Sequence, residues 1–393
     1  MSALSILIFA PAVPPVVGGI EMFLGTLTRG LARRGVRVSL LCGNEPEPEM
    51  RDAAVGSGGF VRVPSLRTPA GAVPWEHRTF AQAQALHELL DETPVDVIHA
   101  ASHDTALATA IVAPGHRRVG VITAFGEMAT ESCGFGRLRS DFVHRLAAID
   151  RYLAWSEYYR RVAISYGIAP EKLRVVLAGV DVEAFGLGDR GRGRELLGVE
   201  EGRFLVCCPS RFSARKGQME LARAMREVAD LPIDLAMTGS LNSGSPAYLE
   251  AVRAELRDAG IDDRVHLLLD VPGERMPDVM TAADIVVQPS HLEGLGGAAL
   301  EAMSAGVPVL LTHTHGFDEI AEPDETAVMV PPGDPSALAA GLRRMYTDPG
   351  LRARVASAGR EHAVAHFSAE RTIDELLALY EELRDVKQGT GDA

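Results

Sequence analysis

The stretch Leu4–Gly43, LSILIFAPAVPPVVGGIEMFLGTLTRGLARRGVRVSLLCG, decides the fold class of this chain. It starts with a short apolar run that ends in turn residues, which is typical of a strand buried on both faces. Apolar residues at helical spacing follow the pair Gly18-Gly19 and end before Gly35, and a second strand-like run begins at Val36. A strand, a glycine turn, a helix and a strand in this order predict a βαβ unit of a parallel sheet.

The same alternation of strands and helices continues along the chain in two series. The glycine- and charge-rich segment Val182–Gly198 separates them and is the predicted boundary. We therefore predict an α/β protein with two Rossmann-like, doubly wound domains that face a cleft, residues 1–185 and 186–393. The final helix, about residues 368–386, is expected to pack back on the first domain, and the last residues are expected to fray. The further predicted strands are 95–101, 118–125, 151–156, 173–181, 204–210, 233–240, 264–269 and 284–290.

Composition agrees with two soluble domains and argues against nucleic acid as a partner. The chain has 393 residues, of which 47% are apolar and 23% charged, so two sizeable cores can form. The net charge of −14 is uneven, because residues 1–185 carry 19 acidic and 18 basic side chains and residues 186–393 carry 34 and 21. A nucleic-acid-binding protein would need a basic face overall.

The cysteines and the N-terminal residues indicate a reduced cytoplasmic protein. Cys42, Cys133, Cys207 and Cys208 have no C-x-x-C spacing and no accompanying histidine pattern, so neither a zinc site nor a disulfide framework is predicted. The start lacks the basic residues of a signal peptide, and no apolar run is long enough for a transmembrane helix. Arginines in the segment Gly136–Arg161 leave a peripheral membrane contact open, although a solvated helical face is the favoured interpretation.

Chemically active side chains follow the predicted strands of the second domain. Ligands of open parallel sheets bind beyond the carboxyl ends of the strands. Arg211 and Lys216 come after one such strand, in SRFSARKGQ. A diphosphate would accept two parallel hydrogen bonds from the arginine and would be attracted by the compact charge of the lysine. Taken alone, these two side chains are also compatible with solvated loop cations. Gly239 and Glu293 end two further strands.

The stretch Pro289–Val309, PSHLEGLGGAALEAMSAGVPV, places two carboxylates around a helix start. The pair Gly296-Gly297 leaves backbone N–H groups bare at the N-terminus of a predicted helix, where a phosphate is favoured. Glu293 precedes this point and Glu301 follows it. Carboxylates on both sides of an anion site indicate a ligand that also carries hydroxyl groups.

Several of these segments together resemble glycosyltransferase family 4, the retaining nucleotide-sugar transferases of the GT-B fold. The resemblance covers nearly the whole chain, and the two glutamates, eight residues apart, are its most specific motif. The segments that carry it are GGIEMFLGTLTRGLARRGVRVSLL, SRFSARKG, TGS, RVHLLLDV, PSHLEGLGGAALEAMSAGVPVL and ETAVMVPPGDPSALAAGLRRMYTDPGLR.

The resemblance implies a role for each matching residue. Arg211 and Lys216 would neutralise the pyrophosphate of the donor, and Glu293 would contact the transferred sugar; these three are the predicted catalytic residues. Glu301 would accept from the ribose hydroxyls, and the nucleobase would lie near Asp270. The complete set of implied donor-binding residues is Gly18, Gly19, Gly239, Asp270, Val271, Leu295, Gly296, Gly297 and Glu301.

The chain departs from the family pattern in its first domain. Where the family usually has T-x-H-G after a strand, this chain has TAFG, so Phe125 replaces a histidine and no catalysis by that side chain is expected. A second departure is His315-Gly316, where the family has paired glycines. The acceptor-side candidates are His99, His103, Phe125 and Glu127.

The predicted function is a retaining glycosyltransferase of the hexosyltransferase type that acts in natural-product or glycoconjugate biosynthesis. A nucleoside-diphosphate sugar is its co-substrate, and no metal or other cofactor is expected, since no D-x-D motif is evident. The acceptor is a hydroxyl of a small molecule, a saccharide or a lipid, with a small polar or cationic compound favoured. A nucleotide-sugar epimerase or hydrolase and a catalytically silent sugar-nucleotide-binding subunit remain as alternatives. The sequence does not fix the donor nucleotide, the linkage or the oligomeric state.

Overall fold

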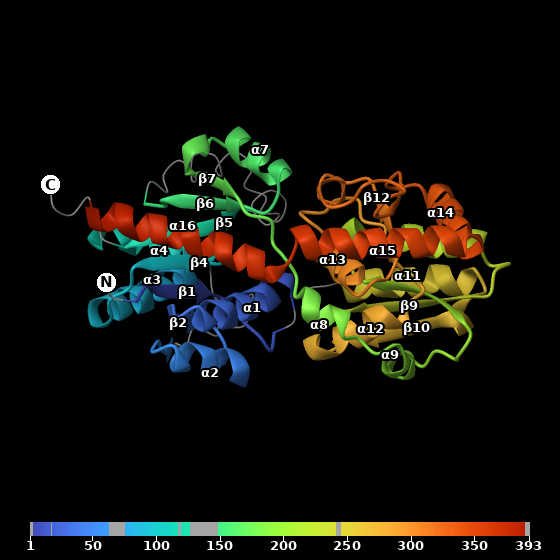
Figure 1. Cartoon of the computed structure of the whole chain (residues 1–393), viewed down its shortest axis with the longest axis horizontal. Helices are drawn as coiled ribbons and strands as arrows, with labels where there is room; N and C mark the ends of the chain where they lie inside the picture. Colours follow the sequence, from blue (N-terminus) through green and yellow to red (C-terminus); the bar gives the residue numbers. More distant parts are fainter. Residues whose placement is uncertain are drawn as a thin grey trace. The chain divides into compact units, whose positions relative to one another are not determined.

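The computed structural model describes residues 3–16, 18–62, 75–116, 119–125, 148–240 and 245–389 (Figure 1). The chain divides into two compact units, Met1–Leu177 with Glu370–Ala393, and Ala178–Ala369. The division thus falls eight residues before the predicted one, and the end of the chain belongs to the first unit. Both units are α/β, each with its own parallel sheet, as predicted. Among the described residues, no helix is both long and apolar enough to cross a membrane.

The first unit is built on a parallel sheet in the order β3-β2-β1-β4-β5-β6-β7. In this order β1 is central, with Ile6 opposite Val38 on one side and Val97 on the other. The β1 segment is buried at every residue, which explains its uninterrupted apolar run. The strands are β1 Ser5–Ala10, β2 Arg37–Cys42, β3 Val61–Arg62, β4 Val97–Ala100, β5 Gly120–Phe125, β6 Arg151–Ala154 and β7 Leu173–Val175.

Helices connect these strands and cover the sheet. Helix α1 begins at the predicted glycine turn and buries Leu24, Leu27 and Leu31, which recur at helical spacing. The helices of this unit are α1 Gly19–Arg33, α2 Pro48–Gly56, α3 Trp75–Glu92, α4 His103–Val112, the short η1 Ala113–Gly115, α7 Glu157–Ser165, the short η2 Pro170–Lys172 and α16 Ala369–Gly389. The strand predicted at 173–181 is shorter in the structure, where β7 covers only Leu173–Val175.

Helix α16 completes the core of the first unit although it lies at the end of the chain. Its apolar residues Ile373, Leu376, Tyr380 and Leu383 are buried in the same cluster as β1, β2 and α1. A Cβ at Gly30 of α1 would lie 2.3 Å from the Ile373 side chain, so this glycine allows the two helices to approach closely. The helix continues through Gly389, so it includes part of the segment 386–393 that was expected to fray.

The second unit has a six-stranded parallel sheet in the order β10-β9-β8-β11-β12-β13. The reversal of strand order lies between β8 and β11, which pair at Val206 with Ile285. This is the position at which open α/β sheets bind ligands, at the carboxyl ends of the strands. The strands are β8 Phe204–Pro209, β9 Ile233–Gly239, β10 Val265–Leu269, β11 Ile285–Gln288, β12 Val309–Thr312 and β13 Val328–Val330.

The helices of the second unit follow the predicted alternation. Side-chain caps start several of them, for example Asp334 on α14 and Asp348 on α15. The helices are α8 Val182–Gly186, α9 Arg190–Leu197, the short η3 Ala214–Lys216, α10 Gln218–Glu227, α11 Pro246–Asp258, η4 Asp262–Arg264, η5 Gly273–Arg275, α12 Met276–Ala282, α13 Gly297–Ser304, η6 Phe317–Glu319, α14 Pro335–Thr347 and α15 Pro349–His366.

The segment Val182–Gly198 is not the open linker that its composition suggested. Asp181 and Asp189 cap two helices within it, α8 and α9, by accepting from backbone N–H groups. Helix α9 packs closely on α12, because a Cβ at Gly193 would lie 2.0 Å from the Asp278 carbonyl oxygen. Glycine and charge in this segment therefore serve helix packing and capping, and not chain flexibility.

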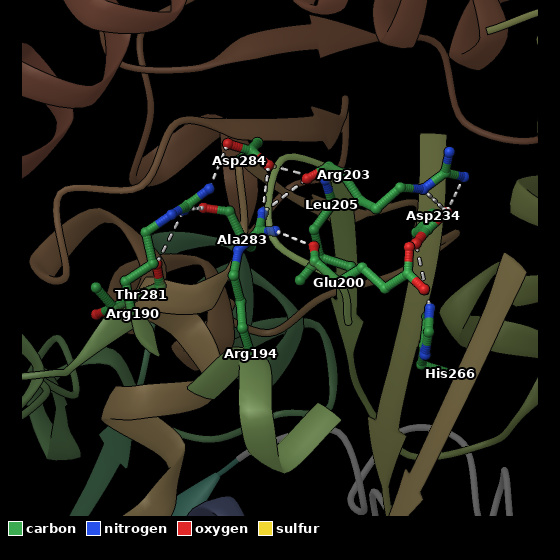
Figure 2. Close-up of polar contacts among 10 residues, drawn as sticks. All are labelled: Arg190, Arg194, Glu200, Arg203, Leu205, Asp234, His266, Thr281, Ala283 and Asp284. Carbon is green, nitrogen blue, oxygen red and sulfur yellow. Dashed lines mark hydrogen bonds and ion pairs between the residues drawn. The ribbon is translucent and has the colours of Figure 1, made fainter. Parts of the chain in front are cut away.

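A network of charged side chains holds α9 to the amino ends of the strands (Figure 2). Asp284, just before β11, accepts from Arg190 at 2.7 Å, from Arg194 at 2.9 Å and from the Leu205 backbone N–H at 2.8 Å. In the same view, Asp234 accepts from Arg203 and lies 3.4 Å from the His266 ring. We refer to these six side chains, with their partners drawn in Figure 2, as the amino-edge network.

Candidate functional site

The candidate site begins where β8 and β11 end, because their loops pack directly against each other. Gly217 has a positive φ of 69°, and a Cβ there would lie 1.9 Å from the Pro289 carbonyl oxygen. Any other residue would be strained and would push the two loops apart. The His291 backbone N–H also donates to the Arg215 carbonyl at 2.8 Å. The two predicted loops, Ser210–Gln218 and Pro289–Gly297, are thereby brought together.

Lys216 and Glu293 form an ion pair between these loops. The Lys216 Nζ lies 2.5 Å from Glu293 Oε1, and both side chains are largely buried, with exposed fractions of 12% and 7%. The Ser290 hydroxyl donates to the same carboxylate oxygen at 2.7 Å. A charge-assisted pair in such a shielded position is strong and fixes both groups. Two of the three predicted catalytic residues therefore meet in the structure.

Arg211 is the third predicted catalytic residue, and it lies in the same loop with an exposed side chain. Within the described part of the chain its guanidinium has no ion-pair partner. Gln218 holds the loop backbone in place by donating from Nε2 to the Arg211 carbonyl and to the Ser210 hydroxyl, each at 2.8 Å. The loop is thus fixed while its cationic side chain stays available to an anion.

Helix α13 starts at the predicted glycine pair. Gly296 has a φ of 96°, and a Cβ there would meet the Phe317 ring at 2.4 Å, so both its conformation and its packing require glycine. Nothing lies within 4 Å of a Cβ placed on Gly297, so the helix N-terminus is open at this residue. Leu295 is buried just before it. Unshielded N–H groups at this end favour an anion.

Glu301 lies one turn into α13 and is the most perturbed carboxylate of the described residues. Its side chain is partly shielded from solvent, and the surrounding protein raises its pKa from 4.5 to about 7, with burial as the cause. Among the residues that the structure describes, no group donates a hydrogen bond to its carboxylate. A carboxyl group in this state is ready to accept from hydroxyl groups of a ligand.

The remaining predicted donor residues of this unit lie at the ends of β9 and β10. Gly239 ends β9, and a Cβ there would lie 2.3 Å from the Ser210 carbonyl oxygen, so this glycine lets the β8 loop approach. Asp270 follows β10 with a φ of 52°, which is uncommon for a residue other than glycine. Its side chain is exposed, and Val271 beside it is buried. A strained residue at the ligand-binding edge agrees with a functional role.

The predicted glycines of the first unit lie at the start of α1, beyond the end of β1. Gly18 is the N-cap in an extended conformation, with a φ of −178°, and no side chain caps the helix. A Cβ at Gly19 would have nothing within 4 Å. A Cβ at Gly18 would lie 2.1 Å from Glu21 Oε2, so the Glu21 carboxylate lies beside this helix start and only the Gly19 side is open.

His99 lies in the core of the first unit, which disfavours the predicted contact with an acceptor. It is 1% exposed, and its Nδ1 lies 2.5 Å from the Tyr380 hydroxyl of α16. Burial lowers the pKa of His99 to about 4, so the ring is neutral at physiological pH. Apolar surroundings and a fixed partner give this histidine a packing role in the structure.

The other acceptor-side candidates are only partly described. His103 is the first residue of α4, and Phe125 ends β5. Glu127 lies outside the described residues. Their predicted roles stay predictions.

The loop that follows β12 packs on the loop that carries Glu293. A Cβ at Gly316 would lie 2.7 Å from the Glu293 carbonyl oxygen, so this glycine is required by close approach. His315, which precedes it, is exposed. The Thr312 hydroxyl, at the end of β12, donates to the Ser290 carbonyl at 2.5 Å.

Sequence reasoning missed the residues that hold the charged groups in position. Ser290, Gln218 and Thr312 are all buried, and their hydrogen bonds fix Glu293 and the Lys216 loop. Their position near the ends of strands could have pointed to these residues, since a polar residue that is buried there needs a hydrogen-bond partner. Nothing in the sequence names that partner.

Comparison with known families gives two matches that together cover most of the chain. Residues 189–362 match the model described as "Glycosyl transferases group 1", and residues 17–184 match "Glycosyltransferase Family 4". Each match falls mainly within one of the two units.

Similar curated proteins carry a common name. The chain is 31% identical over 242 residues to a D-inositol 3-phosphate glycosyltransferase of Catenulispora acidiphila, which covers 60% of this chain and 58% of that protein. It is 27% identical over 402 residues to the protein of that name from Geodermatophilus obscurus, covering 92% and 84%. For three of these relatives, the matched region spans only 53–58% of the relative's own length.

Solved structures show the same fold. Anabaena Alr3699/HepE, in complex with UDP and glucose, is similar with a TM-score of 0.80 at 21% identity, over 96% of this chain and all of that one. WaaG, a glycosyltransferase involved in lipopolysaccharide biosynthesis, gives a TM-score of 0.69 at 18% identity, over 98% and 100%. The prediction of two Rossmann-like domains in a chain of the GT-B fold is thus confirmed.

Proposed function

The chain belongs to the group 1 glycosyltransferases of family 4, and on that premise we propose that it transfers a sugar from a nucleoside-diphosphate sugar to an acceptor hydroxyl. The observation that carries the proposal is the Lys216–Glu293 pair at the carboxyl ends of β8 and β11. It places a cation and a carboxylate side by side, which are the groups that a diphosphate and a sugar hydroxyl need.

The donor diphosphate is met by cations and backbone N–H groups. Lys216 exchanges its contact with Glu293 for a phosphate oxygen, while the exposed Arg211 supplies a second positive charge. The open N-terminus of α13 at Gly297 adds N–H donors. We propose that these groups stabilise the departing diphosphate without a metal ion. Preorganised donors of this kind each contribute about 10²–10³ in rate.

The sugar end is held by Glu293. Once Lys216 turns to the phosphate, the Glu293 carboxylate accepts from a sugar hydroxyl and keeps its hydrogen bond from Ser290. We propose a retaining transfer, in which the bond from the anomeric carbon to the phosphate oxygen breaks and the acceptor oxygen bonds on the same face. The acceptor proton passes to the departing phosphate oxygen, so the protein acts by positioning and charge stabilisation.

The nucleoside end is held by Glu301. Its carboxylate has no donor among the described residues and is expected to accept from the two ribose hydroxyls. Donor binding then gives hydrogen-bond donors to a partly shielded charge that has none, which favours the bound state. The nucleobase is proposed to lie near Asp270, whose backbone has a positive φ of 52°.

The acceptor is proposed to be a small polar compound with a hydroxyl group. Relatives named D-inositol 3-phosphate glycosyltransferases make a cyclitol phosphate the first compound to test. Saccharides and lipids follow, since WaaG is involved in lipopolysaccharide biosynthesis.

Cys42, Cys207 and Cys208 are buried free thiols, which supports the reduced cytoplasm as the compartment.

The proposal is tested by nucleotide release from a panel of nucleotide sugars, with and without candidate acceptors. Release that depends on an acceptor is the expected result. Release or an epimerised donor without acceptor would favour the epimerase or hydrolase, and donor binding with neither product would favour a silent binding subunit.

A variant at the sugar end sharpens this test. Glu293→Gln is expected to lose most of the turnover while it still binds the free nucleoside diphosphate, because the sugar is the only part of the donor that Glu293 is proposed to contact. Arg343→Ala, which removes an exposed ion pair with Asp230 in the same unit, serves as the control and is expected to behave as wild type. Unchanged turnover in Glu293→Gln would remove this residue from the site.

A further inference from the structure

A second cluster of chemically active side chains lies in the first unit, whereas Lys216, Glu293 and Glu301 all lie in the second unit. It consists of His87, Asp91 and His116, which we call the histidine–aspartate triad. One ligand atom from each residue lies within 4.8 Å of the others. His116 Nε2 lies 3.5 Å from His87 Nδ1 and 3.8 Å from Asp91 Oδ1. The other ring nitrogen of His87, Nε2, lies 3.6 Å from Asp91 Oδ2.

Local folding explains why these three residues meet. His87 and Asp91 are four residues apart near the end of α3, so they lie on one face of the helix. His116 follows η1, at the turn that leads into β5. Strands β4 and β5 are neighbours in the sheet, and α3 lies beside α4 (Figure 1). The triad therefore sits at the amino ends of β4 and β5, the edge opposite to the start of α1.

The spacing of the triad fits a divalent transition metal. Zinc binds imidazole nitrogen and carboxylate oxygen at about 2.0–2.2 Å, which in a tetrahedral site places ligand atoms about 3.3 Å apart. One ligand atom from each residue already lies within 4.8 Å of the others, so the exposed His87 and Asp91 side chains need to move inward by about 1.5 Å at most to reach this spacing. Two nitrogens and one carboxylate oxygen are a ligand set that such metals accept, with water in the remaining position.

The electrostatic surroundings also favour a cation. The triad lies at the C-terminal end of the 18-residue helix α3, where the last carbonyl groups carry a partial negative charge. Glu88 is a further carboxylate on the same turn of the helix. His116 is largely shielded, with 16% exposed, whereas His87 and Asp91 are about 60% exposed, so a metal ion could enter from solvent.

We propose that His87, Asp91 and His116 bind one divalent transition-metal ion, with zinc as the reference metal. The ion ties the end of α3 to the turn before β5 and so stabilises the first unit. It takes no part in the transfer reaction, because its ligands lie at the opposite edge of the sheet from Gly19. Each neutral histidine donates one ring nitrogen, and no bond other than coordination is formed.

The experiment titrates zinc chloride into the full chain after removal of metals with a chelator. Calorimetry is expected to show one bound ion, and the melting temperature is expected to rise with zinc. Cobalt used in place of zinc is expected to give the visible absorption of a nitrogen-coordinated ion. The absence of zinc binding to the wild-type chain would overturn the proposal.

Variants locate the ion. His116→Ala and His87→Ala are each expected to weaken zinc binding by at least about tenfold and to abolish the zinc-dependent rise in melting temperature. His87 is exposed, so His87→Ala keeps the test valid if His116→Ala does not fold. Zinc affinity equal to wild type in either folded variant would contradict the site.

A second histidine pair in the chain provides the matched control. His362 and His366 are also four residues apart, on α15, with ring centroids 4.9 Å apart. His366→Ala is expected to bind zinc as tightly as wild type. If His366→Ala loses the ion and His116→Ala keeps it, the metal belongs to α15 and the proposal fails.

Discussion

The two edges of the sheet in the second unit treat charge in opposite ways. At the amino edge, Asp284 accepts from two arginines and a backbone N–H, and Asp234 accepts from Arg203 beside His266 (Figure 2). At the carboxyl edge, Glu301 has no donor among the described residues. The first arrangement compensates its charges within the fold. The second pairs Lys216 with Glu293 but leaves the Glu301 carboxylate and the Arg211 guanidinium without ion-pair partners among the described residues.

This difference separates structural from functional charge better than the shape of the surface does. A hollow of about 630 Å³ at the amino edge is lined by Arg203, Asp234 and His266, whose charges already have partners. Buried groups that are left without partners cost stability, and a fold retains them when a ligand pays that cost. The unpaired Glu301, together with the Lys216–Glu293 pair, therefore identifies the carboxyl edge as the candidate site.

The largest expected effect is on catalysis at the carboxyl edge. Lys216→Ala is expected to lower kcat/KM by about 10²–10³, because the variant loses a preorganised cation at the departing diphosphate. Steady-state kinetics with the best donor and acceptor measure it, and circular dichroism checks the fold. Wild-type kinetics in this variant would mean that Lys216 serves only to neutralise Glu293.

The converse effect is expected at the amino edge. Asp284→Asn is expected to lower the free energy of unfolding by about 2 kcal/mol, since Arg194 is buried and would lose its only carboxylate partner in the described network. Chemical denaturation measures this, and kcat/KM per folded molecule should stay at the wild-type value. Asp324→Asn, which breaks the exposed pair with Arg344, is the control, with an expected change below about 0.5 kcal/mol.

A substitution at Glu301 is expected to stabilise the protein and to impair donor binding. The folded-state pKa is about 7 against 4.5 for the free side chain, so the unfolded chain gives up its proton first as the pH rises. The free energy of unfolding of the wild type then falls between these two values and stays low above them. Glu301→Gln avoids this loss and should be more stable by about 2 kcal/mol near pH 8.

The same variant should equal the wild type below about pH 4.5, where the carboxyl group is protonated in both states. Denaturation curves at the two pH values test this difference. Equal stability of variant and wild type near pH 8 would show that Glu301 is solvated or paired in solution.

The smallest expected effect is a pH dependence of donor affinity. Ribose hydroxyls donate best to the ionised Glu301, so the Kd of the donor should rise as the pH falls below about 7, by at most about tenfold per pH unit. Calorimetric titration of the donor over this range measures it. In Glu301→Gln the affinity should be weaker and flat in pH, and a slope like that of the wild type would assign the titration to another group.

Much of the fold could be predicted from the sequence, because its elements are locally encoded. The apolar run of β1, the glycine turn before α1 and the return to β2 gave the parallel sheet without further information. The segment Val182–Gly198 was misread, since glycine and charge also occur where two helices pack closely, as Gly193 does against Asp278. Composition alone does not separate a close contact from a flexible link.

The candidate site was predictable where ligand chemistry constrains residue type, and not where packing decides. Lys216 and Glu293 stand out as charges in glycine-containing loops after strands, and Glu301 as a charge in the helix that follows the second loop. His99 also lies near the end of a strand, but it is in the core beside Tyr380, more than 280 residues later in the chain. The spacing of cysteines carries no information on the histidine–aspartate triad, because its side chains come from a helix and a turn that only the fold brings together.

The position of α16 has a consequence for biosynthesis. The first unit contains the N-terminal sheet, yet Ile373, Leu376 and Tyr380 close its core from the other end of the chain. While the ribosome still makes the second unit, the apolar face of the nascent first unit has no cover from this helix. The first unit is translated first but can complete its core only after α16 has been made. Until then its exposed apolar face is a surface that chaperones can bind.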